Sequence, residues 1–170
     1  MDTQERRQAI ARTLEGASGP VSAAALAKTY QVSRQVIVGD IALLRAGGMA
    51  ISATPRGYIL PQGSTGLIRT LACRHGGEQT EEELNAIVDQ GCTVLDVIVE
   101  HPVYGQLTAQ LQLSSRYEVN QFVSRCHLHN APPLSTLTGG IHLHTISCPN
   151  EMAYQRVCDS LKKLDILMDE

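Results

Sequence analysis

Two histidines one residue apart, His142 and His144, lie in the stretch GGIHLHTI at 139–146. Successive side chains of a β-strand point to opposite faces, so both imidazoles are expected on the same face. Imidazole nitrogen is a favoured ligand of divalent first-row transition metals, and two rings on one face can share an ion. Exposed strand faces also tolerate histidine freely, so the pair predicts a metal site only if further ligands converge on it.

A second stretch, CRHGGEQTEEEL at 73–84, supplies two further donors, His75 and Glu83. His75 is predicted to end a strand, and a helix is predicted to begin at Thr80 after two glycines. Glu83 then has two interpretations. In one, Thr80-x-x-Glu83 is a capping box, in which the carboxylate accepts a hydrogen bond from the amide at the helix start. In the other, the carboxylate joins the histidines as a metal ligand.

Another H-x-H pair, His127 and His129, occurs in the stretch CHLHNAPP at the predicted end of a helix. Helical side chains two positions apart diverge by about 200°, so these rings are not expected to share an ion. They are predicted as loop or C-cap residues, where a cation is favourable beside the negative end of the helix.

The elements that position these residues follow from hydrophobic periodicity. The pattern predicts strands near 67–75, 92–100, 103–113 and 137–147, and helices near 80–90, 116–127 and 150–167. The order βαββαβα suits an α+β domain with an antiparallel sheet and helices on one face, an open-faced sandwich. The phosphocarrier protein HPr has the same order, which is an analogy of fold only. The stretch PQGSTG at 61–66 lacks periodicity and is predicted as a linker between a domain at 1–61 and another at 66–170.

The first domain is predicted to be a winged helix. One amphipathic helix covers 3–16, a second is AAALAKTY after Ser22, and Ser33 caps a third that begins RQVIVGDIALL. Two helices joined by a tight turn make a helix-turn-helix, and MAISATPRGYIL is typical of a β-hairpin wing with Arg56 at its tip. Together the α+β class, the winged helix and the sandwich form the expected fold.

The third helix of a winged helix enters the major groove, so its residues are the DNA-binding candidates. We expect Ser33, Arg34 and Gln35 at the bases, with Arg45 and Arg56 at phosphates. Three helices with a hairpin also occur as protein-interaction modules that contact no DNA. Gly39 fits poorly in the middle of this helix, where glycine costs about 1 kcal/mol relative to alanine. Close packing against a neighbouring backbone is the only explanation that the sequence offers.

Composition separates the two halves further. Residues 1–62 carry seven Lys or Arg against four acids, and the remaining 108 residues carry seven against thirteen. A basic front half indicates a polyanion as its partner.

There is no Trp and a single Phe, which disfavours a stacking platform for single-stranded nucleic acid. No run approaches the roughly 18 apolar residues of a membrane span, and the first residues lack a signal peptide, so a cytoplasmic location is expected. Five cysteines without a C-x-x-C pair predict reduced, mostly buried thiols.

Residues 1 to about 61, through VSRQVIVGDIALLRAGG and ISATPRGYIL, resemble the winged helix of the nicotinate-responsive repressors, which control genes of NAD-precursor salvage and uptake. Residues 66–167 resemble the three-histidine regulatory domain of that family, through HGGEQTEEELNAIVDQG, VEHPVYGQL and TGGIHLHTI. The resemblance implies that His75, Glu83, His142 and His144 ligate a metal. Three imidazoles and a carboxylate suit Ni, Zn or Fe and do not suit Ca or Mg.

The resemblance also implies an effector and a mode of action. The segment of His101 and Tyr104 is characteristic of the family and could line the effector pocket, although His101 could equally be a turn histidine. The expected function is a repressor, not an enzyme, that binds operator DNA as a homodimer with nicotinate as co-repressor. Two alternatives are a repressor that senses the metal itself and a metalloenzyme fused to a DNA-binding domain, whose general base would be Glu78, Glu81 or Glu82.

A final pattern bears on the dimer. The last predicted helix has an apolar stripe that could either pack on the sheet of its own chain or pair with a second copy. Its members are Val157, Leu161, Leu164 and Met168.

Overall fold

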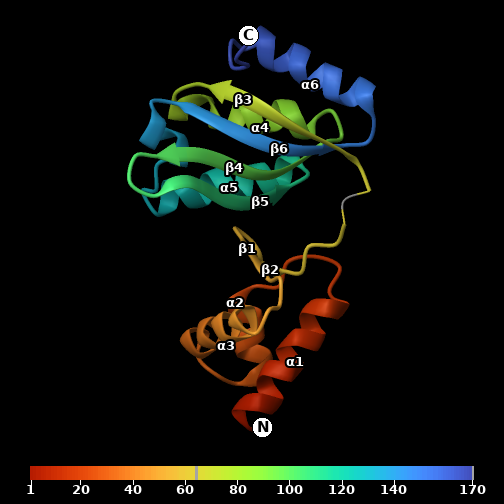
Figure 1. Ribbon diagram of the computed structural model, residues 1–170, viewed down its shortest axis with the longest axis vertical. Helices are drawn as coiled ribbons and strands as arrows, with labels where there is room; N and C mark the ends of the chain where they lie inside the picture. Colours follow the sequence, from red (N-terminus) through yellow and green to blue (C-terminus); the bar gives the residue numbers. More distant parts are fainter. Residues whose placement is uncertain (64, 170) are drawn as a thin grey trace. The chain divides into compact units, whose positions relative to one another are not determined.

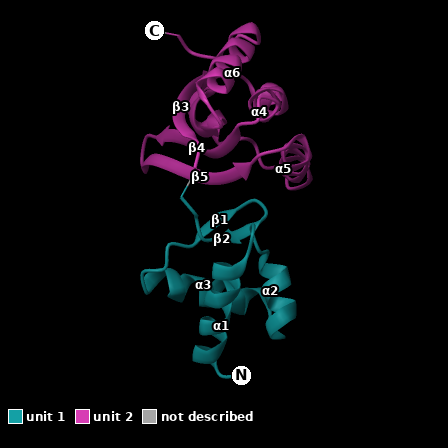
Figure 2. Cartoon of the chain, turned by 90° about the vertical axis from the view of Figure 1, so that its right-hand side faces the viewer, with its two compact units in different colours: residues 1–63 teal, residues 64–170 magenta. Residues whose placement is uncertain are grey.

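The computed structural model describes residues 1–63 and 65–169. The chain divides into two compact units, residues 1–63 and 64–170, which Figure 2 colours separately. Ser64 in the predicted linker and Glu170 at the end of the predicted second domain lie outside the described residues.

The first unit contains three helices and a short hairpin, as the sequence predicts. The elements are α1 (Thr3–Gly16), α2 (Ala23–Tyr30), α3 (Arg34–Ala46), β1 (Ser52–Thr54) and β2 (Gly57–Ile59). The two strands pair antiparallel around the turn that carries Arg56. The predicted caps are present, because the hydroxyls of Ser22 and Ser33 accept from the amides of Ala25 and Val36. The core of the unit consists of Ile10, Leu14, Leu26, Ile37, Ile41 and Ile51.

A buried ion pair joins α1 to α3 within this unit. The Arg6 Nε donates to Asp40 Oδ2 at 2.6 Å, and a second guanidinium nitrogen donates to Oδ1 at 3.2 Å. Asp40 is only 3% exposed, so its carboxylate needs this bidentate partner. The contact fixes which face of α3 points inward and leaves the opposite face to solvent.

The second unit is an antiparallel sheet with helices, in the predicted βαββαβα order (Figure 1). Its strands are β3 (Leu67–Arg74), β4 (Thr93–His101), β5 (Gly105–Leu113) and β6 (Ile141–Cys148), and its helices are α4 (Thr80–Val88), α5 (Arg116–Leu128) and α6 (Glu151–Lys163). The strand order is β3-β6-β4-β5. A single core lies between the sheet and the helices, and α4 packs beside both α5 and α6. The expected α+β class is therefore confirmed.

The strand that carries the H-x-H pair begins later than predicted. A 3₁₀ helix occupies Leu134–Thr138, and β6 starts only at Ile141. Gly139 and Gly140 lie between them with φ angles of 62° and 95°, which strand residues do not adopt. The two glycines therefore turn the chain into β6, with His142 as its second residue.

The last helix is shorter than predicted, and its apolar stripe faces inward. α6 ends at Lys163, and Asp165 takes a left-handed φ of 58°. The chain then runs along β3, where Leu167 pairs with Cys73 as an isolated bridge. Val157 and Leu161 are fully buried in the core of their own unit and Leu164 packs against it, so these three pack within the chain. Met168 lies beyond the helix and is 41% exposed.

The cysteines differ from the prediction at one pair. Cys92 and Cys148 are paired as a disulfide, whereas the other three cysteines are free. Antiparallel pairing of β4 with β6 brings these residues opposite each other, although 56 positions separate them in the sequence. The prediction of reduced thiols is therefore wrong for this pair.

None of the helices in the described part of the chain combines the length and apolar character that a membrane crossing requires.

The predicted capping box at the start of α4 is absent. The N-cap is Gln79, which makes no side-chain cap hydrogen bond, and the Thr80 hydroxyl is buried without a protein partner. The Glu83 carboxylate is occupied elsewhere, by histidines described below. The capping-box interpretation of Glu83 is therefore wrong.

This geometry predicts the effect of removing the Thr80 hydroxyl. Thr80→Val keeps the shape of the side chain and removes only a buried hydroxyl that has no hydrogen bond. The free energy of unfolding should therefore rise, or fall by less than about 0.5 kcal/mol. A matched control is Asn150→Ala, because Asn150 caps α6 by accepting from the amide of Ala153 at 2.9 Å. Losing that cap should cost about 1 kcal/mol in urea unfolding. A similar loss for Thr80→Val would restore the capping role of Thr80.

Candidate functional site

Four polar side chains meet in the interior of the second unit. His75 directly follows β3, Glu83 lies in the first turn of α4, and His142 and His144 are on β6. Because β3 pairs with β6, the register sets Cys73 opposite His142 and brings the end of β3 beside the start of β6. The four residues are between 1% and 7% exposed, which is rare for such groups unless they are paired or bind a metal.

The three imidazoles converge on one carboxylate. The Nε2 atom of His75 lies 2.6 Å from Glu83 Oε2, that of His142 lies 2.8 Å from Oε1, and that of His144 lies 3.3 Å from Oε2. The ring of His142 stands edge-on between the other two, with centroids 4.8 Å from His75 and 4.9 Å from His144. The structure therefore brings together all four predicted metal ligands.

The second nitrogen of each ring is held by a backbone carbonyl. The Nδ1 atoms of His75, His142 and His144 lie 2.6, 2.8 and 2.7 Å from the carbonyl oxygens of Gly76, Gly140 and Asp96. A carbonyl only accepts, so each Nδ1 must carry a proton. In a neutral ring, the lone pair is then on Nε2 and points into the cluster. Metal-binding histidines have this arrangement, in which a backbone acceptor fixes the tautomer and the ring direction.

The charges in the cluster require a cation. Three neutral Nε2 lone pairs facing a carboxylate would repel it, so either protons or a metal ion must lie between them. Burial alone would raise the pKa of Glu83, but the histidines, His144 foremost, hold the pKa well below its usual value. Burial would lower the pKa of His75 and His144, yet Glu83 raises both. A divalent ion bound by the four groups would supply the same compensating charge without protons.

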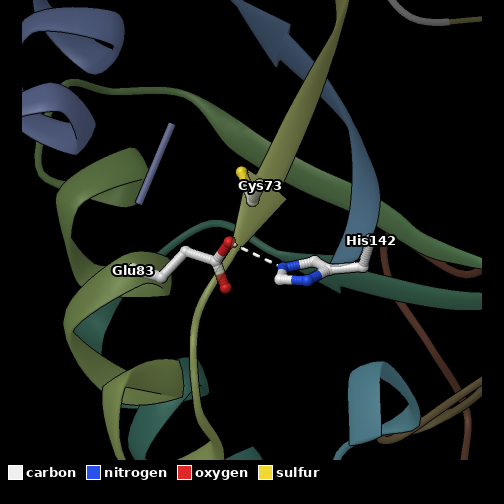
Figure 3. Close-up of side chains that lie close together, drawn as sticks. All are labelled: Cys73, Glu83 and His142. Carbon is white, nitrogen blue, oxygen red and sulfur yellow. Dashed lines mark hydrogen bonds and ion pairs between the residues drawn. The ribbon is translucent and has the colours of Figure 1, made fainter. Parts of the chain in front are cut away.

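A cysteine that the sequence did not single out lies against this cluster. Figure 3 shows Cys73 next to Glu83 and His142, and the donor atoms of the three residues lie within 4.8 Å of one another. Burial, followed by the charge of Glu83, raises the pKa of the Cys73 thiol, so the sulfur is protonated when the site holds no metal. Cys73 lies in β3 two residues before His75, so the two side chains are expected on the same face, and this spacing was the signal in the sequence.

Two backbone positions shape the site, and neither was predicted. A Cβ on Gly140 would collide with the backbone of His75, so only glycine lets the entry to β6 pass this close to His75. Asp96 lies at an irregularity of β4, where its carbonyl accepts from His144 and its Oδ1 accepts from the amide of Thr145 at 2.9 Å. An irregular strand register cannot be read from periodicity, which explains why Asp96 was missed.

The remaining histidines lie outside the cluster. The ring of His101 accepts from the amides of Val103 and Tyr104 at the turn between β4 and β5, which agrees with a turn histidine. Tyr104 itself is 76% exposed. His129 is the C-cap of α5, as predicted, whereas His127 lies within the last turn of α5 and is neither a loop nor a C-cap residue. Neither His101 nor Tyr104 lines the cavity beside the cluster.

That cavity has a volume of about 710 Å³ and opens next to His75. Its wall includes Arg74, the glycines on both sides of the cluster and the chain end after α6. It is large enough for a small aromatic acid.

The DNA-binding candidates are exposed in the first unit. Arg34, Gln35 and Arg45 lie on the solvent side of α3, and Arg56 is at the exposed turn of the hairpin. The Ser33 hydroxyl is already used as the N-cap of α3.

Comparisons with known proteins agree with this two-part organisation. Residues 6–59 match a helix-turn-helix domain, and residues 68–170 match the 3H domain. The chain is 48% identical over 167 residues to the probable transcription repressor NiaR of Thermotoga maritima, covering 98% of this chain and 95% of that protein. It is 44% identical over 169 residues to the transcription repressor NadR of Bacillus subtilis, covering 97% and 94%. The chain belongs to this family of transcription repressors.

Family membership confirms the resemblance that the third helix and the three motifs of the second domain indicated. The chain is therefore a transcription repressor, and its helix-turn-helix implies operator DNA as its partner. The relatives are regulators of transcription, which argues against the metalloenzyme alternative. Glu78, Glu81 and Glu82, the general bases which that alternative required, are exposed around the start of α4.

Proposed function

We propose that this repressor is a cytoplasmic homodimer that senses niacin and controls genes of NAD-precursor salvage and uptake. Nicotinate acts as the co-repressor and increases the affinity for a palindromic operator. The second unit binds a divalent transition metal, Ni, Zn or Fe, through His75, Glu83, His142 and His144, and the metal helps to hold the effector.

One observation carries the metal centre in this proposal. All three rings keep Nδ1 on a backbone carbonyl and direct Nε2 at a single buried carboxylate. In a purely structural cluster every polar atom has a hydrogen-bond partner. Here the Nε2 lone pairs of three neutral rings face the oxygens of the Glu83 carboxylate, which can only accept. Four protein ligands leave a position free on a five- or six-coordinate ion. A pyridine nitrogen or a carboxylate has the chemistry to fill it.

The cavity next to His75 supports a pyridine carboxylate as the effector. Arg74 lies on its wall and offers a guanidinium that can bind a carboxylate in two-point fashion. Nicotinate in the cavity would lie beside Arg74 and His75. Nicotinamide has no negative charge for Arg74, so the proposal expects it to bind more weakly.

A thermal-shift titration tests the effector. Nicotinate, nicotinamide and NAD are added to metal-loaded protein and to protein treated with a chelator. Nicotinate at a hundredfold excess over its Kd should stabilise the loaded protein by about 2.7 kcal/mol, and the shift should vanish after chelation. Binding of nicotinate to metal-free protein with equal affinity would contradict a metal-held effector. A shift with metal alone and none with any pyridine would favour the metal-sensing repressor instead.

The coupling between effector and DNA needs a separate measurement. If nicotinate changes how the two winged-helix domains of the dimer are placed on the two half-sites, it should raise the affinity for operator DNA more than for random DNA. Fluorescence anisotropy with both duplexes measures the two affinities in the presence and absence of nicotinate. Equal changes for both duplexes would rule out this mode of action, and sedimentation would show whether the repressor is a dimer.

A further inference from the structure

The outward face of α3 has a gap where a side chain would normally be. The inward face carries Ile37, Asp40 and Ile41, all buried. Positions 35, 39 and 42 lie opposite, one helical turn apart, and all three are exposed. Gly39 therefore lies near the middle of the face that the repressor presents to its partner.

Nothing inside the first unit accounts for a glycine at this position. A Cβ on Gly39 would meet no atom within 4 Å, and Gly39 is not among the glycines with a positive φ. The expected packing against a neighbouring backbone is therefore wrong. Alanine would fit without strain and would favour the helix. Glycine at this exposed position leaves room for a partner to approach the backbone of α3 closely.

The residues beside Gly39 indicate what approaches. Val36 and Val38 are each 38% exposed and lie on either side of Gly39 around the helix, while Gln35 precedes it by one turn. The basic residues Arg34 and Arg45 lie at the two ends of the same helix. The major groove offers both matching chemistries, phosphates along its rims and thymine methyl groups on its floor.

We propose that Gly39 is a specificity-determining residue, at which base edges approach the backbone of α3 most closely, and that Val36 and Val38 contact thymine methyl groups beside it. This inference rests on the family's operator-binding function. A helix with its side chains is about as wide as the major groove, so the missing side chain lets α3 lie deeper. Only then do short valine side chains and Gln35 reach the bases.

The test uses the full chain, with nicotinate and a divalent transition metal present, and a library of random duplexes about 30 bp long, enough for two half-sites. Duplexes selected by the wild-type protein are then titrated with Gly39→Ala. The melting temperature of the first unit should rise by about 5 °C, because alanine favours the helix. Affinity for the selected duplex should fall at least about tenfold, while affinity for unselected DNA stays within about twofold.

Gly16→Ala is the matched control, since Gly16 ends α1 and an added Cβ there also meets no atom within 4 Å. It should leave both affinities unchanged. Unchanged affinity of Gly39→Ala for the selected duplex would overturn the inference and leave the operator-binding function intact. Failure to select any sequence would instead remove the proposed operator binding and this inference with it.

Replacing thymine by deoxyuridine tests the methyl contacts, because it removes only the methyl group. At one or more positions of the selected duplex, the change should weaken wild-type binding about fourfold. The double variant Val36→Ala, Val38→Ala should lose this sensitivity. If no thymine position responds, or if the double variant keeps the same response, the valines do not read methyl groups and the inference fails.

Discussion

Replacing Glu83 by glutamine is expected to lower the affinity of the second unit for a divalent transition metal at least about a hundredfold. The side chain keeps its size and one carbonyl oxygen, so the cluster loses charge rather than shape. Three imidazoles remain, but the anionic ligand that offsets the charge of the ion is gone. Competition with a chelator of known affinity measures the change at constant pH.

The same substitution should destabilise the metal-free protein. Glu83 holds three buried rings, and removing the charged partner of a buried group costs about 3–5 kcal/mol. Glu82→Gln is the matched control, because Glu82 is the preceding carboxylate of α4 and is exposed. It should change neither metal affinity nor stability by more than about 0.5 kcal/mol. Wild-type metal affinity in Glu83→Gln would show that Glu83 is not a ligand.

The predictable parts of the fold are those with local causes. Ser22 and Ser33 mark helix starts because their hydroxyls cap the backbone, and this cause is visible within three residues. The pairing of His142 with His144 on one face follows from strand geometry alone. Their meeting with Glu83 does not, because it depends on β3 pairing with β6 and on α4 crossing the sheet. The family resemblance supplied that part.

What the sequence could not predict depends on contacts between distant segments. The Asp96 carbonyl meets His144 where the pairing of β4 with β6 is irregular, and Cys92 meets Cys148 because these two strands run antiparallel. Glu83 shows the opposite problem, since the local capping-box pattern was complete and still wrong. Three buried rings offered the carboxylate stronger bonds than one amide at the helix start could.

Stability of the second unit should depend on pH in opposite ways with and without metal. In the metal-free protein, Glu83 raises the pKa of His75 and His144 above the ordinary 6.5, against the effect of burial. A histidine whose pKa is higher in the folded than in the unfolded protein stabilises the folded state. This contribution is complete at a pH below the pKa of the unfolded protein, and it is lost as the pH rises through the pKa of the folded protein. The lowered pKa of Glu83 acts on the acid side of the pH range. Its contribution to stability is lost as the pH falls below 4.5, the ordinary pKa of a glutamate. Metal-free protein should therefore be most stable between about pH 4.5 and 6.5.

Metal reverses the trend on the alkaline side. Binding displaces protons from the rings, so metal affinity rises with pH, and the loaded protein should keep its stability up to pH 8. At a hundredfold excess of metal over its Kd, the stabilisation of about 2.7 kcal/mol corresponds to a rise in melting temperature of about 10–20 °C. Melting curves from pH 5 to 8, with and without a chelator, should therefore separate as pH rises. His101→Asn, outside the cluster, should leave the separation unchanged, whereas Glu83→Gln should abolish it. Parallel curves for the wild-type protein would mean that protons and metal do not compete for these rings, and the cluster would then be structural.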